Sequence, residues 1–325
     1  MSNKTADKII EYIKNKKQVA AGELVDYLGI SRQALFKHHL SKLLKNGALV
    51  KIGKPPKVFY LLKEKKEARP RYKIDKKLIK IINTNYLIIT PGGEKLEGYK
   101  GFVYWCEKQE LPVEKTAKEY ALTLQKYARY KKSGLIGGMQ KIKGTFSNVY
   151  LDKMYYLDFY SIERFGKTKL GQLLLYAKQS QNKKLMKELI SATRISAEKL
   201  IKKFKIGGVG FIPPTVKRET QFMNELKKKM HLAIKEIAIT KIKTDIIVPQ
   251  KTLNKLNDRI ENAKKTFAVE ETGNFNVILL IDDAVGSGAT LNEIAKKIKG
   301  RGIAKKVIGL AITGSFKGFD VISEV

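Results

Sequence analysis

The first 64 residues carry apolar side chains at helical spacing in three successive stretches, followed by two β-rich runs. Gly29 closes the second helical stretch, and Ser31 stands where it can cap the third. Residues 48–52 and 58–62 flank a Gly-Lys-Pro-Pro turn and predict a hairpin. The sequence thus predicts an α+β domain over residues 1–64. The inward faces of the helices are expected at Ile9, Ile10 and Ile13, at Leu24, Val25 and Leu28, and at Leu35, Phe36, Leu40, Leu43 and Leu44.

The rest of the chain divides into a charged connection, a segment with weak patterns and a region of alternating strands and helices. Residues 65–80 are charged and contain a proline, which is typical of a linker. Residues 81–147 form a helix-rich segment in which no chemistry is visible. Over residues 148–325 the alternation predicts an α/β domain with a mainly parallel sheet. Strands are expected at 86–90, 154–161, 207–212, 236–242, 276–281 and 306–313, and helices at 113–132, 170–178, 185–203, 218–234 and 291–299.

Composition adds a strong positive charge to this picture. The chain has 65 Lys and Arg against 31 Asp and Glu, which gives a net charge of +34. Such an excess favours polyanionic partners such as nucleic acid, anionic membranes or phosphorylated ligands. Because the lysines are scattered over the whole chain, a general lysine bias explains the charge equally well. Charge alone therefore leaves both interpretations open.

Apolar runs and cysteine content bound the cellular context. The longest apolar run without glycine, Val277–Ile281, is far shorter than the roughly 20 residues that a membrane span needs. We therefore expect no membrane association and a cytoplasmic location. The single cysteine, Cys106, cannot form an intramolecular disulfide or a structural zinc site. Its apolar neighbours predict burial rather than nucleophilic catalysis.

The most informative stretch is residues 277–290, VILLIDDAVGSGAT. Five apolar residues predict a buried parallel strand, so Asp282 and Asp283 follow at its carboxyl end, where open α/β sheets bind ligands. The small loop after them opens a helix, and its glycines allow backbone N–H groups to approach an anion. Two carboxylates beside a phosphate site would repel the phosphate unless they bound ribose hydroxyls or Mg²⁺. The pattern therefore predicts a site for a sugar phosphate.

This stretch resembles the signature with which type I phosphoribosyltransferases bind 5-phosphoribosyl-1-pyrophosphate (PRPP). The resemblance implies the type I phosphoribosyltransferase fold, with Asp282 and Asp283 on the ribose 2′ and 3′ hydroxyls and Mg²⁺ held there with them. It implies that the loop wraps the 5′-phosphate. The chain has glycine at the first loop position, where many members have threonine. The loop residues are Gly286, Ser287, Gly288, Ala289 and Thr290.

Further residues are similar to the pattern of the ComF family, the competence-associated phosphoribosyltransferase-like proteins. The resemblance covers about residues 150–325, and its upstream part consists of Pro249, Gln250, Leu253, Arg259, Asn262 and Phe267. Lys217 and Arg218 stand where the family has its pyrophosphate loop, and their charges could neutralise a diphosphate. The chain departs from the family by Glu219, by the lack of a glycine after Arg218 and by the lack of a four-cysteine zinc ribbon.

The stretch 29–38, GISRQALFKH, resembles the helix-turn-helix of biotin-repressor-like winged helices. Helical rotation puts polar side chains on the face that would enter a major groove of duplex DNA. Lys54 and Lys57 flank the hairpin tip, where they would contact phosphates. Winged helices also serve as protein-interaction modules, and the basic wing favours DNA. The candidate DNA-binding residues are Ser31, Arg32, Gln33, Lys37, His38, Lys54 and Lys57.

Two functions of different classes follow from these resemblances. In the first, the protein is a transcriptional regulator whose phosphoribosyltransferase-like domain senses PRPP or a related sugar phosphate and changes DNA affinity. In the second, it is a Mg²⁺-dependent phosphoribosyltransferase that transfers phosphoribose to a nitrogenous base, with Asp282, Asp283, Lys217 and Arg218 at the reacting centre. A weaker third hypothesis is a competence-type accessory of DNA uptake or processing. Winged-helix regulators are often dimers, so a homodimer is the default expectation.

Overall fold

The computed structural model describes residues 2–63, 72–216 and 218–316, and it divides the chain into two units. The N-terminal unit spans Met1–Arg71 and the C-terminal unit spans Tyr72–Val325. The expected site residue Lys217 lies outside the described residues. Each unit has its own hydrophobic core.

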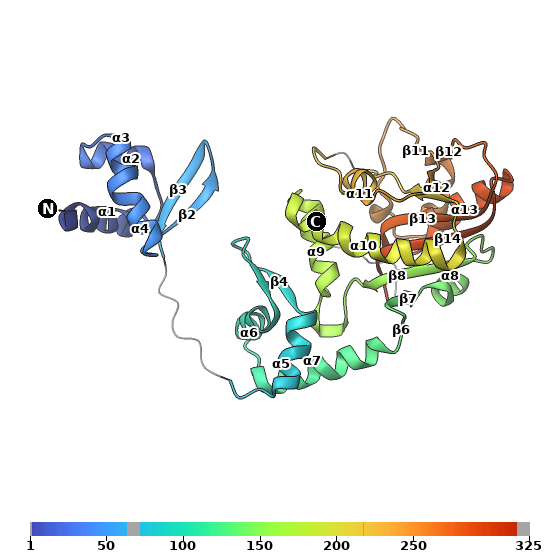
Figure 1. The fold of residues 1–325 in the computed structure, drawn as a ribbon, viewed down its shortest axis with the longest axis horizontal. Coiled ribbons are helices and arrows are strands. Elements are labelled where there is room, and N and C mark those ends of the chain that lie inside the picture. Colours follow the sequence, from blue (N-terminus) through green and yellow to red (C-terminus); the bar gives the residue numbers. More distant parts are fainter. Residues whose placement is uncertain (1, 64–71, 217, 317–325) are drawn as a thin grey trace. The chain divides into compact units, whose positions relative to one another are not determined.

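The N-terminal unit consists of helices packed on a small antiparallel sheet (Figure 1). Its strands lie in the order β1-β3-β2, and the β2–β3 hairpin has the predicted position. The two-residue strand β1 was not predicted, because so short a run has no periodicity. The elements are α1 (Ser2–Lys16), β1 (Val19–Ala20), α2 (Ala21–Leu28), α3 (Arg32–Ala34), η1 (Leu35–Leu40), α4 (Ser41–Lys45), β2 (Leu49–Lys54) and β3 (Lys57–Leu62).

The third helix of this unit departs from regular α-helical geometry. Ser31 caps it as predicted, accepting the Ala34 N–H at 3.1 Å. The segment η1 is a π-helix, and the Ser41 hydroxyl donates to the Phe36 carbonyl, five residues earlier, at 2.6 Å. The wider turn changes which side chains point inward. Leu35 and Leu40 are fully buried, whereas Phe36 is 36% exposed, so its predicted inward position is wrong.

The C-terminal unit combines helices with a seven-stranded sheet in the order β10-β9-β13-β14-β8-β7-β6 (Figure 1). The pairs from β10 to β8 are parallel, and β7 and β6 are antiparallel. The predicted α/β class with a mainly parallel sheet is therefore confirmed. The helices are α5 (Lys76–Asn85), α6 (Gly98–Lys108), α7 (Val113–Ala128), α8 (Met139–Thr145), η2 (Glu163–Phe165), α9 (Lys169–Gln179), α10 (Lys183–Phe204), α11 (Phe222–Met230), η3 (Gln250–Thr252), α12 (Leu256–Thr266) and α13 (Ala289–Gly300). The strands are β4 (Leu87–Ile89), β5 (Lys95–Glu97), β6 (Lys131–Lys132), β7 (Leu135–Gly137), β8 (Lys153–Phe159), β9 (Gly208–Phe211), β10 (Lys235–Glu236), β11 (Ile239–Lys241), β12 (Phe267–Val269), β13 (Phe275–Val285) and β14 (Ala304–Gly314).

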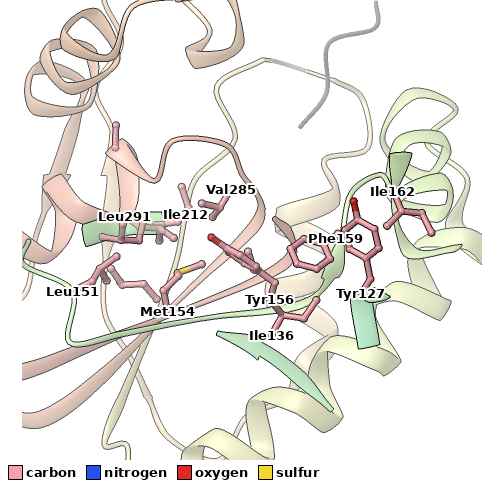
Figure 2. Close-up of a cluster of buried hydrophobic side chains, with 14 of the residues drawn as sticks. Tyr127, Ile136, Leu151, Met154, Tyr156, Phe159, Ile162, Ile212, Val285 and Leu291 are labelled. Atoms are coloured by element: carbon pink, nitrogen blue, oxygen red, sulfur yellow. The ribbon is translucent and has the colours of Figure 1, made fainter. Parts of the chain in front are cut away.

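Two hydrophobic clusters cover the two faces of the sheet. Helices α9, α10 and α11 pack with Leu279 and Ile281 on one face. Helices α8, α12 and α13, together with α5 to α7, join the cluster that contains Ile278 and Leu280. Figure 2 shows part of this second cluster, in which the rings of Tyr127 and Phe159 lie edge to face with centroids 5.4 Å apart. The central strands are therefore buried on both faces, as their unbroken apolar runs predict.

Four elements differ clearly from their predicted bounds. The strand predicted at 236–242 is two short strands, β10, which pairs with β9, and β11, which pairs with β12. Strand β13 continues to Val285, four residues past the predicted end, because β14 continues beside it and pairs with the stretch Asp282–Val285. The basic helix predicted at 218–234 is only Phe222–Met230, and it ends at His231, whose φ of 44° lies in the left-handed region. The helix predicted at 113–132 ends at Ala128, and the hairpin of β6 and β7 follows.

The segment 81–147 belongs to the C-terminal unit and contributes directly to its sheet. Strand β7 pairs with β8, with Ile136 opposite Tyr156. Helix α5 begins at Lys76, inside the stretch interpreted as a linker, while residues 64–71 lie outside the described part. Among the described residues, no helix is both long and apolar enough to cross a membrane.

Candidate functional site

The carboxyl ends of β9 and β13 form the point where the strand order reverses. From β9 the chain proceeds through α11 outward to β10, whereas from β13 it proceeds through α13 to β14 on the other side. Ligands of open parallel sheets bind in the crevice at such a reversal. The Ile212 N–H donates to the Ile281 carbonyl at 2.9 Å, so the loop after β9 begins beside Asp282. The predicted acids therefore lie at the edge where a ligand is expected.

Asp282 and Asp283 are both residues of β13 rather than of the loop after it. The Asp282 carboxylate accepts the Asp283 N–H at 2.8 Å. Burial, and then the negative charge of Asp283, raise the pKa of Asp282 to about 8. Carboxyl groups whose pKa is raised by burial and a neighbouring charge are enriched at functional sites, although ion-pair networks also produce them.

Lys178, at the end of α9, was not found by sequence reasoning and contacts this acid pair. Its Nζ atom lies 2.6 Å from Asp283 Oδ2, and the two side chains are only 25% and 16% exposed. The Arg218 guanidinium donates to the Lys178 backbone carbonyl, so Arg218 reaches the same edge as predicted. The helical pattern of residues 170–178 gave no sign that Lys178 faces a carboxylate, because lysines are common at helix ends.

The loop Gly286–Thr290 enters α13 as predicted, and its middle is buried. The Ser287 hydroxyl accepts the Ala289 N–H at 3.3 Å, and Ser287 is only 4% exposed. Gly288 has a φ of 88°, which an L side chain rarely adopts. A Cβ atom at Gly288 would lie 2.4 Å from Cδ1 of Ile142. The glycine is therefore required by packing against α8 as well as by the turn.

Helix α8 lies in the segment 81–147 and forms one wall beside the loop. The Lys141 ammonium donates to the Ser315 carbonyl at 3.2 Å and also to the Ser315 hydroxyl. The Ser315 hydroxyl in turn lies 3.4 Å from the Gly286 carbonyl. Burial, and then the positive charge of Arg259, lower the pKa of Lys141 to about 8. Sequence reasoning missed Lys141 because nothing in its segment resembles a binding motif.

Four of the ComF-pattern residues come together in one hydrogen-bonded group. The Gln250 amide donates to the Arg259 carbonyl at 2.9 Å and to Asn262 Oδ1 at 3.2 Å. The Arg259 Nε donates to the Leu253 carbonyl at 2.6 Å. Arg259 is 8% exposed, so it packs inside the segment that carries the pattern. The pattern therefore marks a structured region around α12.

The carboxylates at this edge offer few ligands to Mg²⁺. Among the residues that the structure describes, no group of three or more His, Cys, Asp or Glu side chains gathers. Mg²⁺ needs only one or two carboxylates when phosphate oxygens complete its shell. Asp283, however, already holds an ammonium ion at contact distance. Of the two predicted ligands, Asp282 fits the metal better.

A separate cavity of about 920 Å³ lies among α5, α7 and the start of α9. Its walls are mostly apolar, and the Asp158 carboxylate reaches it from the end of β8. Burial raises the pKa of Asp158, and Lys131, 3.8 Å away, opposes that rise. None of the site residues predicted from the sequence lines this cavity.

The candidate DNA-binding side chains of the N-terminal unit are solvent-exposed. The Ser31 hydroxyl caps the helix by accepting the Ala34 N–H, and the side chains of Arg32 and Gln33 that follow it are exposed. Arg32 lies over the ring of Phe36, 6.0 Å from its centroid. The exposed candidates are Ser31, Arg32, Gln33, Lys37, His38, Lys54 and Lys57.

The comparisons with known proteins add no further support. The chain matches no family model, and it matches no curated protein. The resemblances to the phosphoribosyltransferases and to winged helices therefore stay predictions made from the residues.

Proposed function

We propose that the C-terminal unit binds PRPP or a related sugar phosphate at the carboxyl ends of β9 and β13. One observation carries the proposal: an acid pair and a buried glycine-containing loop that opens α13 stand together at the reversal of strand order. Backbone N–H groups at the start of α13 would hold the 5′-phosphate, aided by the positive end of the helix dipole. Asp282 would accept hydrogen bonds from the ribose hydroxyls.

We further propose that the N-terminal unit binds duplex DNA and that the whole protein is a ligand-responsive transcriptional regulator. The exposed basic residues at the hairpin tip, Lys54 and Lys57, suit phosphate contacts. The capped helix that begins at Arg32 presents Gln33 and Lys37 to solvent, where they could reach base edges. Coupling between two such sites is usually worth about 1–3 kcal/mol, or 5- to 150-fold in affinity.

Phosphoribosyl transfer is the second candidate, and the position of Arg218 favours it. Its guanidinium contacts the backbone carbonyl of Lys178, whose ammonium pairs with Asp283. In this reaction a base nitrogen attacks the anomeric carbon and the diphosphate leaves with the electrons of the broken C–O bond. Two cations would stabilise the charge on the leaving diphosphate. Mg²⁺, if bound with the substrate, would supply further charge neutralisation.

One experiment separates these candidates in the full-length protein. Calorimetry with PRPP and Mg²⁺ first tests ligand binding for the wild type and for Asp282→Asn. Pyrophosphate release with a panel of nucleobases and DNA affinity are then measured in parallel.

Ligand-shifted DNA binding without turnover supports the regulator. Base-dependent pyrophosphate release with unchanged DNA affinity supports the transferase. Equal PRPP affinity for the wild type and for Asp282→Asn contradicts the sugar-phosphate site itself.

A further inference from the structure

We propose that the Lys178 ammonium is the resident cation of the acid pair and takes the place that a divalent metal would otherwise occupy. The inference rests on the proposed sugar-phosphate site for its functional meaning. It concerns this chain's own residues, however, and can be tested with a metal ion alone. Its consequence is a sugar-phosphate site that works without Mg²⁺ bound to the protein.

Lys178 and Asp283 form a direct, partly buried ion pair rather than a solvent-exposed one. Nζ lies 2.6 Å from Asp283 Oδ2, which is within hydrogen-bond distance. Both side chains are mostly removed from water, so the attraction between them is screened less than at an exposed site. A divalent ion bound to this oxygen would have to displace the ammonium first.

The backbone around Lys178 is fixed by the loop that follows β9. The Arg218 guanidinium donates to the Lys178 carbonyl, and the Thr220 N–H donates to Gln181 Oε1 at 2.5 Å. The Ser180 N–H donates to the Tyr176 carbonyl at 2.9 Å and closes the helix. Lys178 is therefore held toward β13 from its own helix and from a neighbouring loop.

The charges of the site explain why one cation suffices. Because burial and the charge of Asp283 raise the pKa of Asp282 to about 8, the two carboxyl groups together carry about one negative charge near neutral pH, which one nearby positive charge balances. Lys178 supplies it without dehydrating a metal ion, which Mg²⁺ resists. The ligand class that fits is a phosphorylated sugar whose hydroxyls meet Asp282 while Lys178 neutralises Asp283.

The first arm of the test uses Mn²⁺ alone, as a spectroscopic substitute for Mg²⁺, with the full-length protein. Wild type is expected to bind Mn²⁺ no better than Asp283→Asn, which removes the carboxylate that Lys178 holds, and Lys184→Met, which removes an exposed lysine at the start of α10, should behave as the wild type does. Lys178→Met should bind Mn²⁺ about 10-fold more tightly or better, because two carboxylates are then free to coordinate it. Lys178→Arg should behave as the wild type does.

The second arm measures ribose 5-phosphate affinity with and without Mg²⁺. Wild-type affinity should change less than about 2-fold, whereas Lys178→Met should depend on Mg²⁺. Two results overturn the inference: Mn²⁺ bound to wild type clearly more tightly than to Asp283→Asn, or no gain in Mn²⁺ affinity for Lys178→Met with folding verified by circular dichroism. If no variant binds ribose 5-phosphate but the Mn²⁺ result holds, the sugar-phosphate proposal fails while the assignment of Lys178 stands.

Discussion

Lys178 and Asp283 form an ion pair with 2.6 Å between Nζ and Oδ2, although 105 residues separate them along the chain. The contact joins the carboxyl end of α9 to the last residues of β13, just before the loop Gly286–Thr290. The site at the end of β13 is thus completed by α9, which packs on the face of the sheet opposite to α8 and α13. No motif around the acids predicts this contribution.

The energy of this ion pair can be measured with a double-mutant cycle. Lys178→Met and Asp283→Asn should each destabilise the protein, and the double variant should lose less than their sum. For a pair this far from water we expect a coupling of about 1–2 kcal/mol in urea unfolding. Strictly additive effects would mean that the pair contributes nothing to stability.

Gly288→Ala should destabilise the fold by about 2 kcal/mol or more, because of the positive φ and the close approach of Ile142 Cδ1. Ile142→Val removes the methyl group that a new Cβ would meet. The cost of Gly288→Ala should therefore fall in the Ile142→Val background when thermal or urea unfolding is measured.

Gly144→Ala on α8 is the matched control for this prediction. No atom lies within 4 Å of a Cβ at Gly144, and its backbone is helical. Helix propensity favours alanine there by about 0.5–1 kcal/mol. Equal effects at Gly144 and Gly288 would contradict the packing role of Gly288.

Lys241 should make stability rise with pH in the alkaline range. Burial lowers its pKa from 10.5 to about 8, and its ammonium lies 4.1 Å from the centre of the Phe267 ring. Between pH 8 and 10.5 the unfolded chain therefore binds more protons, so stability increases with pH and is unchanged below pH 8. The expected gain is about 1 kcal/mol after allowance for solvent screening.

Urea unfolding at pH 7.5 and 10 checks this for wild type, Lys241→Met and the exposed control Lys243→Met. Lys241→Met should show an increase about 1 kcal/mol smaller than that of wild type and Lys243→Met, because Lys141, whose pKa burial also lowers to about 8, still contributes. The same pH dependence in wild type and Lys241→Met would contradict the prediction.

Cys106 should resist alkylation in the native protein. The side chain is fully buried, and burial raises the pKa of its thiol to about 12. The thiolate that reacts with iodoacetamide is therefore nearly absent at pH 8. Mass spectrometry should show modification only after addition of denaturant, and rapid labelling of native protein would disprove the burial.

Duplex DNA binding should depend on the hairpin tip. Lys54→Glu with Lys57→Glu should weaken binding to every sequence and flatten its salt dependence, because phosphate contacts are lost. Gln33→Ala should mainly relax specificity. Fluorescence anisotropy against salt concentration measures both effects in the full-length protein, with the double variant Lys143→Glu and Lys184→Glu in the C-terminal unit as the charge-matched control. Unchanged affinity in the lysine variants would favour a protein-interaction role for the hairpin.

The sequence predicted those helices and strands that are specified by a run of apolar residues or by a capping residue within the element itself. The apolar run at 277–281 is enough to predict a buried strand, and Ser31 is enough to predict a helix start. The end of β13 could not be predicted, because the strand continues through Asp282 and Asp283 only where β14 pairs with it. Phe36 was misplaced because the π-helical turn widens the helix without any proline or glycine to signal it.

The contributions of Lys178 and Lys141 to the site depend on packing between distant segments. Lysine occurs 56 times if the nine arginines are subtracted from the 65 basic residues, so its identity carries little information at any one position. Only the fold distinguishes the lysine that meets Asp283 from those in solvent. Arg218, by contrast, was expected near the site because the ComF resemblance places it in the pyrophosphate loop that follows β9.

The contact of Ile142 with Gly288 determines how small a working fragment of this protein can be. A fragment that starts at residue 148 would contain the acids and the loop but would lack α8, leaving Gly288 and its neighbours open to water. It would also lack β7, so β8 would become an unprotected edge strand and a template for aggregation. Fragments for expression should therefore begin before α5, near residue 72, since α5 to α8, which join the cluster on this face of the sheet, come before β8, the first parallel strand.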